Sequence, residues 1–487
     1  MAPNDDQILR TMIYDNPWWS RGTVPKHKIP DFHRRDFFKL REQLSSDIPQ
    51  ILGILGPRRV GKTTVMHQLI RHLIGEGVDP KRILFSRMDD AILGLLDSPL
   101  DKILDIYFRS IIRESPAALD EECYVFLDEI QSLPKWNLQL KRWFDLDFRI
   151  KFVVSGSSSP QIQRSSESLV GRISQRFMMP LKFLEIARHR NMEHDSLLKA
   201  ANSALRIGFK DSISSGESEP FLEKVGNQNS VFLPIQDEIA LILDDYVLRG
   251  GYPEIQLGGL SLDETARRLR DQIHLVIYRD IVRVFQIRDP NLMEELIALL
   301  AIETSQRANY SNLADTLGAK LDTIKSYVNY LEDVFLVSKS SFYSGSRSSS
   351  LRKEKKLSIN DPGVRNIAAG TLDEDLLRDS DQVGKIIESI VVDHCKRLAY
   401  NLEGKLNTET FYWRSKSQEL DIVIQLGRKL IPIEVKYQPK ITSSDRKPIK
   451  QFMNKYDCQV AFILTKNTSD IVDNVIHMPV WKFLLMC

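Results

Sequence analysis

The stretch ILGILGPRRVGKTTVMHQLIRHLIGEG, residues 51–77, decides the fold of the first part of this chain. Its apolar beginning is typical of a buried parallel strand, and its later part has the apolar spacing of a helix that ends near Gly75 or Gly77. The intervening GPRRVGKT matches the pattern GxxxxGK[ST]. Glycines let the backbone N–H groups of such a loop turn toward a phosphate, and the following helix presents its N-terminus to the same charge. The stretch therefore predicts a phosphate-binding loop.

This loop predicts a site for ATP and Mg²⁺. Lys62 is expected to reach the β- and γ-phosphates, where it would act in catalysis, and the Thr63 hydroxyl is expected to bind the metal. The predicted nucleotide-binding residues are Gly56, Pro57, Arg58, Arg59, Val60, Gly61, Lys62, Thr63, Thr64 and Ser157.

A second acidic motif completes the expected site. In Tyr124-Val125-Phe126-Leu127-Asp128-Glu129, an apolar strand ends in two carboxylates, at the edge where α/β sheets bind ligands. Asp128 is predicted to hold Mg²⁺ through water, and Glu129 to deprotonate the attacking water. The next apolar run ends in Ser155-Gly156-Ser157, so that Ser155 or Ser157 is expected to sense the γ-phosphate.

The wider pattern indicates an α/β fold. Apolar runs at 82–90, 123–131 and 150–159 read as further strands, with helical patterns between them. This alternation predicts a parallel sheet that is covered by helices.

Several blocks resemble one family. They are NPWW at 16–19, GPRRVGKTT, LDEIQ with Pro134-Lys135-Trp136, SGSSS, and LVGR at 169–172 followed by MPL. Together they are similar to a prokaryotic, especially archaeal, group of AAA+-type ATPases with a C-terminal domain of unknown function. The resemblance implies an N-terminal lead-in over 1–45 and a P-loop AAA+-type core over 46–190. It also suggests Arg172 as a catalytic arginine, in cis or from a neighbouring subunit of a homo-oligomer, although a structural ion pair explains Arg172 equally well.

The middle of the chain divides into two expected parts. Residues 191–305 read as a helical region with a flexible insertion near 205–235, because SISSGESEPFLEKVGNQNS is rich in Ser, Gly, Glu and Asn. Residues 306–365 are similar to a winged helix, in which two helices precede two short strands around a basic loop. A basic wing suits DNA phosphates, although winged helices also dock proteins. The predicted DNA contacts are Lys320, Lys325, Arg347, Arg352 and Lys353, with Lys355 and Lys356 on the same wing.

Residues 380–487 contain a second constellation. Glu434 and Lys436 in IPIEVK are two apart and share one face of a strand. A turn at Gly427-Arg428 would bring Asp421 of the preceding strand close to Glu434. This D…ExK pattern resembles the restriction-endonuclease-like, or PD-(D/E)XK, nucleases. That resemblance implies metal ligands at Glu388, Asp421 and Glu434, with Glu419 as a further candidate, and a catalytic role for Lys436. Taken by itself, the ExK pattern is equally explained by charged side chains on the solvent face of a half-exposed strand.

Composition limits the partners and the location that these motifs can imply. The 67 basic and 65 acidic residues nearly cancel, so any DNA affinity must come from local basic surfaces. The four cysteines are widely spaced and are expected to be reduced. With a polar N-terminus and no long apolar stretch, a cytoplasmic location without membrane contact is expected.

We therefore expect an ATP-dependent DNA-binding and DNA-processing ATPase, whose C-terminal site could cut DNA with Mg²⁺. One alternative is an ATP-driven switch or regulator whose winged helix binds DNA or a protein and whose nuclease-like domain does not cut. A protein-remodelling ATPase that is indifferent to DNA is another.

Overall fold

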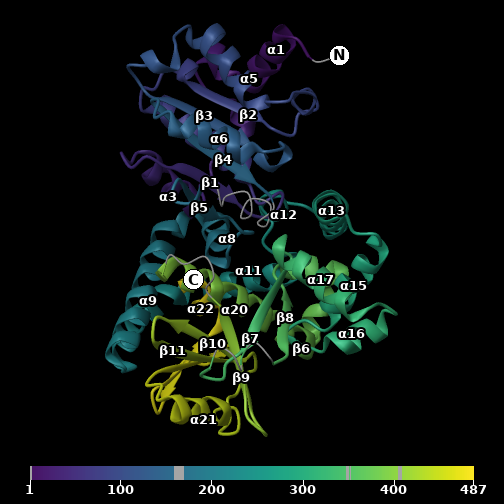
Figure 1. The fold of residues 1–487 in the computed structure, drawn as a ribbon. Helices are drawn as coiled ribbons and strands as arrows, with labels where there is room; N and C mark the ends of the chain where they lie inside the picture. The colour runs from purple at the N-terminus through teal and green to yellow at the C-terminus, as the bar shows by residue number, and fades with distance from the viewer. Residues whose placement is uncertain (1–2, 158–168, 347–349, 351–352, 404–408) are drawn as a thin grey trace. The chain divides into compact units, whose positions relative to one another are not determined.

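The computed structural model describes residues 3–157, 169–346, 350, 353–403 and 409–487 (Figure 1). The chain divides into two compact units, Met1–Met179 and Pro180–Cys487. Among the residues described, no helix has the length and apolar character that crossing a membrane requires.

The N-terminal unit is built on a parallel sheet with the strand order β2-β3-β4-β1-β5. Its strands are β1 (Ile51–Leu55), β2 (Ile83–Arg87), β3 (Cys123–Asp128), β4 (Ile150–Gly156) and β5 (Ile173–Phe177). The first four lie where the apolar runs predicted them, and the α/β fold class is confirmed. The fifth was not predicted, because ISQRF is only half-buried and carries little apolar signal.

Helices cover both faces of this sheet. They are α1 (Asp5–Asp15), α2 (Trp18–Arg21), α3 (Arg35–Leu44), α4 (Lys62–Gly75), α5 (Pro99–Ile106), a π-helical segment (Tyr107–Ile112) and α6 (Trp136–Asp145). The face with α1, α5 and α6 forms one large apolar core, while α3 and α4 pack together on the other face.

The lead-in is an integral part of this unit. The Asn16 side-chain amide donates to the Phe85 carbonyl over 2.8 Å, and its oxygen accepts from the Phe85 N–H over 2.6 Å. Both Trp18 and Trp19 donate their indole N–H to the carbonyl of Ile83. The NPWW motif thus satisfies backbone groups on β2, which is the edge strand.

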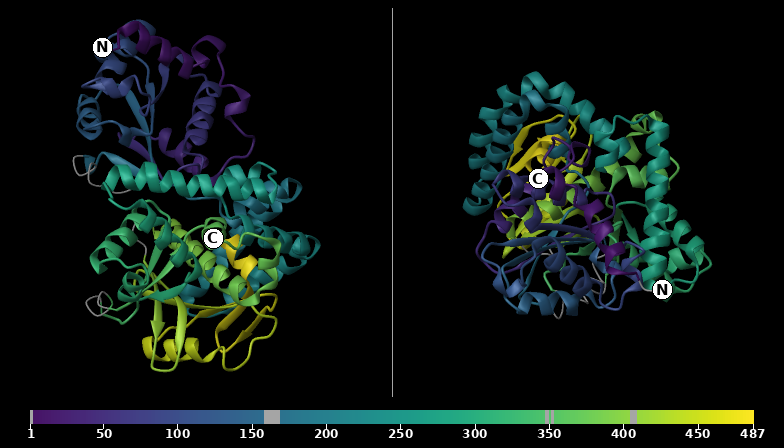
Figure 2. Two further views of the ribbon diagram at one scale, coloured as in Figure 1. Left: turned by 90° about the vertical axis from the view of Figure 1, so that its right-hand side faces the viewer. Right: turned by 90° about the horizontal axis from the view of Figure 1, so that it is seen from above.

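The C-terminal unit contains most of the helices. They are α8 (Phe183–Arg190), α9 (Asp195–Ser215), α10 (Glu219–Phe232), α11 (Gln236–Arg249), α12 (Pro253–Leu257), α13 (Leu262–Leu275), a π-helical segment (Val276–Ile281), α14 (Val282–Phe285), α15 (Pro290–Ile302), α16 (Tyr310–Thr316), α17 (Leu321–Asp333), α19 (Pro362–Ala368), α20 (Ser380–Glu403), α21 (Lys447–Tyr456) and α22 (Val480–Met486). The segments from α13 to α14 follow one another as one long helical rod (Figure 2).

The predicted flexible insertion near 205–235 is wrong. This stretch lies in α9 and α10, which pack against each other. Several of its apolar side chains are buried, and two of them, Phe209 and Phe221, contact the ring of Phe462. Tertiary burial therefore overrides the loop-like composition.

The predicted domain boundaries after residue 179 also differ from the structure. The Leu181 N–H donates to Gly251 O over 2.6 Å, and Arg397 donates to Pro180 O over 2.6 Å, so residues 180–190, which were predicted to end the ATPase core, pack with the second unit. Residues 306–365 and 380–487, which were predicted as two domains, lie in the same compact unit. They share one nine-stranded sheet with the order β13-β14-β12-β11-β10-β9-β7-β8-β6.

The strands of this sheet are β6 (Gln306–Ala308), β7 (Val337–Phe342), β8 (Lys355–Ile359), β9 (Thr410–Arg414), β10 (Glu419–Leu426), β11 (Lys429–Lys436), β12 (Ala461–Thr465), β13 (Asp470–Val472) and β14 (Val475–Pro479). The parallel pairing of β7 with β9, at Ser341 and Phe411, joins the two regions. The elements of this region follow in the order α15, β6, α16, α17, β7, β8, with β8 paired between β6 and β7, and the winged-helix hypothesis stays a prediction.

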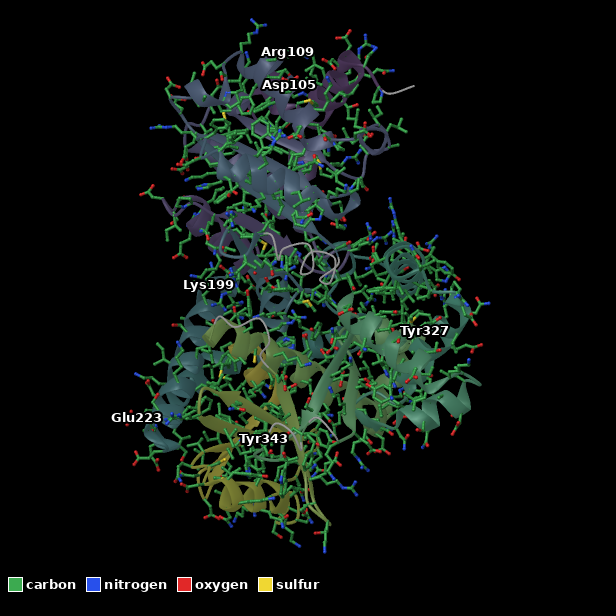
Figure 3. The ribbon with its side chains drawn as sticks, in the orientation of Figure 1. Asp105, Arg109, Lys199, Glu223, Tyr327 and Tyr343 are labelled. Carbon is green, nitrogen blue, oxygen red and sulfur yellow. The ribbon has the colours of Figure 1, made fainter. Side chains whose placement is uncertain are left out.

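Helices pack on both faces of the C-terminal strands. Phe452 of α21 lies with Ala461 and Ile463 in one apolar core. Figure 1 shows α21 at its lower end, next to strands of this sheet. Tyr343, labelled in Figure 3, extends this core through ring contacts with Phe452 and Tyr456, at centroid distances of 5.8 and 5.1 Å. The other face of the sheet or its margin is contacted by α20, α22 and α9. Phe462 lies between Ala461 and Ile463 on β12 and therefore points to this other face, where its ring meets Phe209 of α9.

Candidate functional site

The predicted phosphate-binding loop connects β1 to α4. Gly56 has a φ of 153°, and a Cβ placed on it would lie 1.9 Å from the Met178 carbonyl oxygen. Gly61 has a φ of 95°, which side-chain-bearing residues rarely adopt. These two glycines are therefore required by the path of the backbone. All the predicted positions from Gly56 to Thr64 lie on this loop or in the first turn of α4.

Lys62 lies inside the curve of the loop. Its ammonium donates to Gly56 O over 3.0 Å and to Pro57 O over 2.8 Å, and the residue is buried. The loop is also held from outside by Arg34, which donates to the Val60 carbonyl over 2.8 Å. The sequence interpretation missed Arg34, because nothing in the motif points to a partner 26 residues upstream. The basic run from His33 to Arg35 was the available signal.

Asp128 and Thr63 meet at the end of β3. The Thr63 hydroxyl donates to Asp128 Oδ2 over 2.7 Å, and the Ser155 hydroxyl donates to Asp128 Oδ1. Burial raises the pKa of Asp128, and the hydrogen bonds from these two hydroxyls partly oppose that shift. The two predicted metal residues of this unit are therefore adjacent, as the parallel order β3-β4-β1 requires.

Glu129 follows in a left-handed conformation with a φ of 54°. Its carboxylate accepts from Gln131 Nε2 over 2.5 Å and lies 3.8 Å from the Arg58 guanidinium. Gln131 also donates to the Ser157 hydroxyl over 2.9 Å, so it joins the predicted base to the predicted sensor. Ser155 accepts from the Glu129 N–H over 3.1 Å, which places both serines in the cluster. Gln131 was not predicted as a site residue, although it stands in the quoted block LDEIQ.

Arg172 does not join this cluster. It lies immediately before β5, and its carbonyl accepts from the Ile51 N–H at the first residue of β1. The loop follows the last residue of β1, roughly 15 Å along the strand at ~3.3 Å per residue. Arg172 instead pairs with Asp145, with Nε 2.6 Å from Oδ1. The prediction that it completes the site in cis is therefore wrong, whereas a role toward a neighbouring subunit stays a prediction.

The residues that are present fit a nucleoside triphosphate with a divalent ion. The two glycines permit the backbone path of the loop, and Lys62 supplies a buried cation against its carbonyl groups. Thr63 and Asp128 offer the hydroxyl and the carboxylate that would hold Mg²⁺.

The predicted C-terminal residues also come together. The turn at Gly427-Arg428 joins β10 to β11, and Ile422 pairs with Ile433, so Asp421 lies next to Glu434. The Asp421 N–H donates to Glu434 Oε2 over 3.3 Å, and Lys436 donates to Glu434 Oε1 over 2.6 Å.

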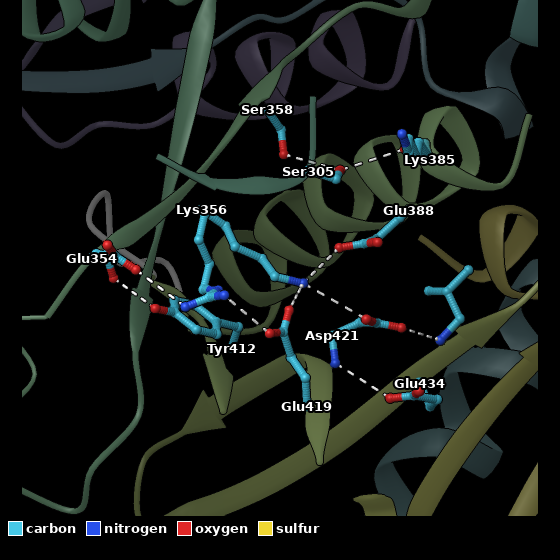
Figure 4. A network of polar contacts seen from close by, with 12 residues as sticks. Ser305, Glu354, Lys356, Ser358, Lys385, Glu388, Tyr412, Glu419, Asp421 and Glu434 are labelled. Carbon is cyan, nitrogen blue, oxygen red and sulfur yellow. Dashed lines mark hydrogen bonds and ion pairs between the residues drawn. The ribbon is translucent and has the colours of Figure 1, made fainter. Parts of the chain in front are cut away.

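The ion pairs of Lys356 bring the remaining carboxylates to this cluster. Lys356 Nζ lies 3.0 Å from Glu388 on α20, 2.9 Å from Glu419 and 3.7 Å from Asp421 (Figure 4). The placement of Lys356 on an exposed basic wing is therefore wrong. Strand β8 is buried on both faces from Lys356 onward, whereas its first residue, Lys355, is half-exposed. Within the described ranges, no three His, Cys, Asp or Glu side chains are arranged to hold a metal ion.

Electrostatics in this cluster follow from burial and from charge pairing. Burial raises the pKa of the Glu388 and Glu434 carboxyls, and the neighbouring Asp421 adds to the shift. Burial alone would lower the pKa of Lys356, but the surrounding carboxylates outweigh it and raise that pKa above its usual value. The same balance raises the pKa of Lys436, chiefly through Glu434.

The predicted DNA-contacting residues are only partly described. Lys320 lies immediately before α17, Lys325 lies on it, and both are exposed, as is Lys353 before β8. Lys325 Nζ is 3.6 Å from Asp322 Oδ1. Arg347 and Arg352 lie outside the described residues.

Three family models match successive parts of the chain. Residues 49–187 match a model described as an AAA domain. The N-terminal unit carries an AAA-type P-loop ATPase domain. Residues 241–375 match a domain of unknown function (DUF8612), and residues 383–483 match another (DUF4143).

Curated relatives are similar along most of their length. An uncharacterized protein of Haemophilus influenzae is 22% identical over 399 residues, which is 80% of this chain and 84% of that protein. Two uncharacterized proteins of Methanocaldococcus jannaschii are 25% and 26% identical, over 92% and 90% of this chain and 87% and 88% of theirs.

Solved structures show weaker likeness. The Aeropyrum pernix ORC1 protein in complex with DNA is 14% identical, with a TM-score of 0.30 over 74% of this chain and 96% of that one. AMPPCP-bound DnaA from Aquifex aeolicus is 13% identical, with a TM-score of 0.25 over 65% of this chain and 92% of that one.

Proposed function

We propose that this chain hydrolyses ATP at the N-terminal site and uses the reaction to control binding of DNA by its second unit. The observation that carries the proposal is the hydrogen bond from Thr63 to Asp128, next to a loop whose path requires glycines and to the buried Lys62. The match of residues 49–187 to the AAA domain model supports it.

The side chains divide the work as follows. Amides of the loop and the Lys62 ammonium would bind the phosphates, while Thr63 and Asp128 would hold Mg²⁺. Bound ATP would supply the phosphoanhydride bond that is broken. Glu129 would accept a proton from the attacking water. Gln131 would position the Glu129 carboxylate next to Ser157, because its amide donates to both side chains.

The roles of Glu129 and Lys62 can be separated by experiment. Glu129→Gln should bind ATP within about threefold of wild type and lower turnover by roughly 100-fold or more, because only the proton acceptor is lost. Lys62→Ala should lose nucleotide binding itself. Glu121→Gln, which changes an exposed glutamate just before β3, is the matched control and should leave turnover unaltered. Full turnover by Glu129→Gln would refute the assignment of the base.

We infer that DNA is contacted through α17 and the β7–β8 hairpin. The supporting observations are the winged-helix order of elements and the exposed ammonium groups of Lys320, Lys325 and Lys353. Such groups recognise phosphates rather than base edges, so sequence-independent binding is expected. ATP turnover measured with and without duplex DNA separates this proposal from a protein-remodelling ATPase, which would be indifferent to DNA.

For the C-terminal cluster we propose the non-cleaving alternative. The carboxylates of Glu388, Glu419, Asp421 and Glu434 lie near one another, but oxygens of all four already face Lys356, Lys436 or backbone N–H groups. The residues therefore do not fit a catalytic Mg²⁺.

Incubation with Mg²⁺ or Mn²⁺ and with labelled single-stranded, duplex and branched DNA tests this directly. No cutting is expected. Cutting that disappears in Asp421→Ala or Lys436→Ala but persists in Lys62→Ala would establish an independent nuclease instead.

A further inference from the structure

Lys356 is a buried lysine at the centre of the carboxylate cluster. It is only 5% exposed, and it reaches the cluster from β8, whereas the carboxylates come from α20, β10 and β11. Figure 4 shows its ammonium group between Glu388, Glu419 and Asp421. Burying a lysine is costly unless its charge is paired, so a position of this kind must be stabilised by specific partners.

Two carboxylates lie within hydrogen-bond distance of the Lys356 ammonium group, and a third lies at ion-pair distance. An ammonium group has three N–H donors, and Lys356 Nζ lies within 3.0 Å of two carboxylates, at Glu388 and Glu419, and 3.7 Å from a third, at Asp421. The ammonium group also lies over the Tyr412 ring, with Nζ 5.7 Å from the ring centroid. Arg307 supports the cluster from its exposed side, with Nε 3.7 Å from Glu419 Oε2.

Oxygens of Asp421 and Glu434 that do not face Lys356 have partners as well. Asp421 Oδ2 accepts from the Val435 N–H over 2.9 Å. Glu434 directs Oε1 to Lys436 and Oε2 to the Asp421 N–H. Mg²⁺ requires oxygen ligands at about 2.0–2.1 Å in near-octahedral geometry. To bind among these carboxylates it would have to displace the ammonium group and leave a buried cation unpaired.

We propose that Lys356 is a built-in cation that takes the place of a divalent metal in this cluster and ties β8 to α20 and β10. It makes the constellation a structural connection between the predicted winged helix and the nuclease-like strands. The inference deepens the non-cleaving function proposed above for this same cluster and rests on it.

The test is Mn²⁺ binding to the full chain without nucleotide. Binding is measured from the electron paramagnetic resonance signal of free Mn²⁺, and thermal unfolding shows whether each variant is folded. Wild type should show no saturable site that depends on Asp421. Lys356→Met, which keeps the length of the side chain but removes its charge, should gain one site, with affinity at least about tenfold tighter than wild type. Adding Asp421→Asn should abolish that gain. Lys355→Met, on the same strand but half-exposed, is the matched control and should behave as wild type.

Two results would overturn the inference. One is saturable Mn²⁺ binding by wild type that Asp421→Asn removes. The other is a folded Lys356→Met chain that gains no site. If Lys356→Met does not fold, the wild-type measurement decides alone, since it predicts no Asp421-dependent site. A wild-type chain that binds Mn²⁺ there yet cuts no DNA would overturn this inference while leaving the proposed function intact.

Discussion

At the scale of single residues, His67 shows how the phosphate loop depends on its surroundings. It lies one turn after Thr63 on α4, and its Nδ1 is 2.9 Å from the Thr63 carbonyl oxygen. Its ring packs against Phe85 and Trp18. Burial lowers the pKa of His67 to about 4, and the positive charge of Lys28 adds to the shift. The ring is therefore neutral at physiological pH.

This depressed pKa predicts a loss of stability in acid. An unfolded histidine accepts a proton near pH 6.5, whereas folded His67 does so only near 4. The stability is thus fully present above 6.5 and declines as pH falls toward 4. The loss should be at most about 3 kcal/mol. We expect His67→Phe to lose less stability between pH 7 and pH 4.5 than wild type, by urea unfolding of the full chain. His72→Phe, at a half-buried position nearer the end of the same helix, is the control. Equal losses in wild type and His67→Phe would contradict the prediction.

The sequence predicted those site residues that stand in a motif, and missed those that act across the fold. Lys62, Thr63 and Asp128 follow from a loop and a strand end whose chemistry is local. Arg34 and Gln131 reach their partners over 26 residues, and no periodicity encodes such a contact. Lys356 was misplaced because a basic run was interpreted as an exposed wing, whereas β8 lies between β6 and β7 and is buried from Lys356 onward.

At the scale of elements, the junction of α11 with α19 is set by close backbone contact. A Cβ on Gly363 would lie 2.2 Å from the Arg249 carbonyl oxygen, which is backbone and cannot rotate away. Asp361 fixes the same junction, since it accepts from the Gly251 N–H over 2.7 Å and from the Val364 N–H over 3.1 Å. The two helices can approach only where no side chain intervenes.

Gly363→Ala should therefore destabilise the C-terminal unit by about 2 kcal/mol or more, because one of the helices must shift. Gly384→Ala is the matched control on α20. Its added Cβ meets nothing within 4 Å, and it should raise stability by about 0.5–1 kcal/mol as a helix-interior substitution. Thermal unfolding of both variants provides the comparison. A Gly363→Ala chain as stable as wild type would show that the junction can widen without cost.

Element boundaries were predictable where periodicity is strong and were lost where pairing is non-local. The four apolar strands of the first unit were found because each is buried on both faces. The pairing of β7 with β9 was not predicted, because it joins two short half-buried strands that are separated by some 70 residues. Sequence patterns specify which face a strand buries, but they do not specify which strand it pairs with.

At the scale of the whole molecule, charge is balanced, so DNA affinity must reside in particular surfaces. The net charge is +2, which gives no long-range attraction for a polyanion. Phosphate contacts release counterions, and each contact contributes about 0.9 to the slope of log affinity against log salt concentration. The proposed surface on α17 thus predicts a measurable salt dependence.

Lys320→Glu combined with Lys325→Glu should weaken binding to duplex DNA and reduce that slope by about 1.8, if both lysines contact phosphates. Fluorescence anisotropy over a range of salt concentrations measures both quantities. The control is Lys210→Glu with Lys224→Glu, which makes the same charge change at exposed positions of α9 and α10. A general loss of positive charge would weaken binding equally in the two double variants, because the net charge falls by the same amount. A loss confined to Lys320 and Lys325 would instead locate the DNA on α17. Equal effects in the two variants would remove the case for a winged-helix contact, while the N-terminal ATPase assignment would stand on its own evidence.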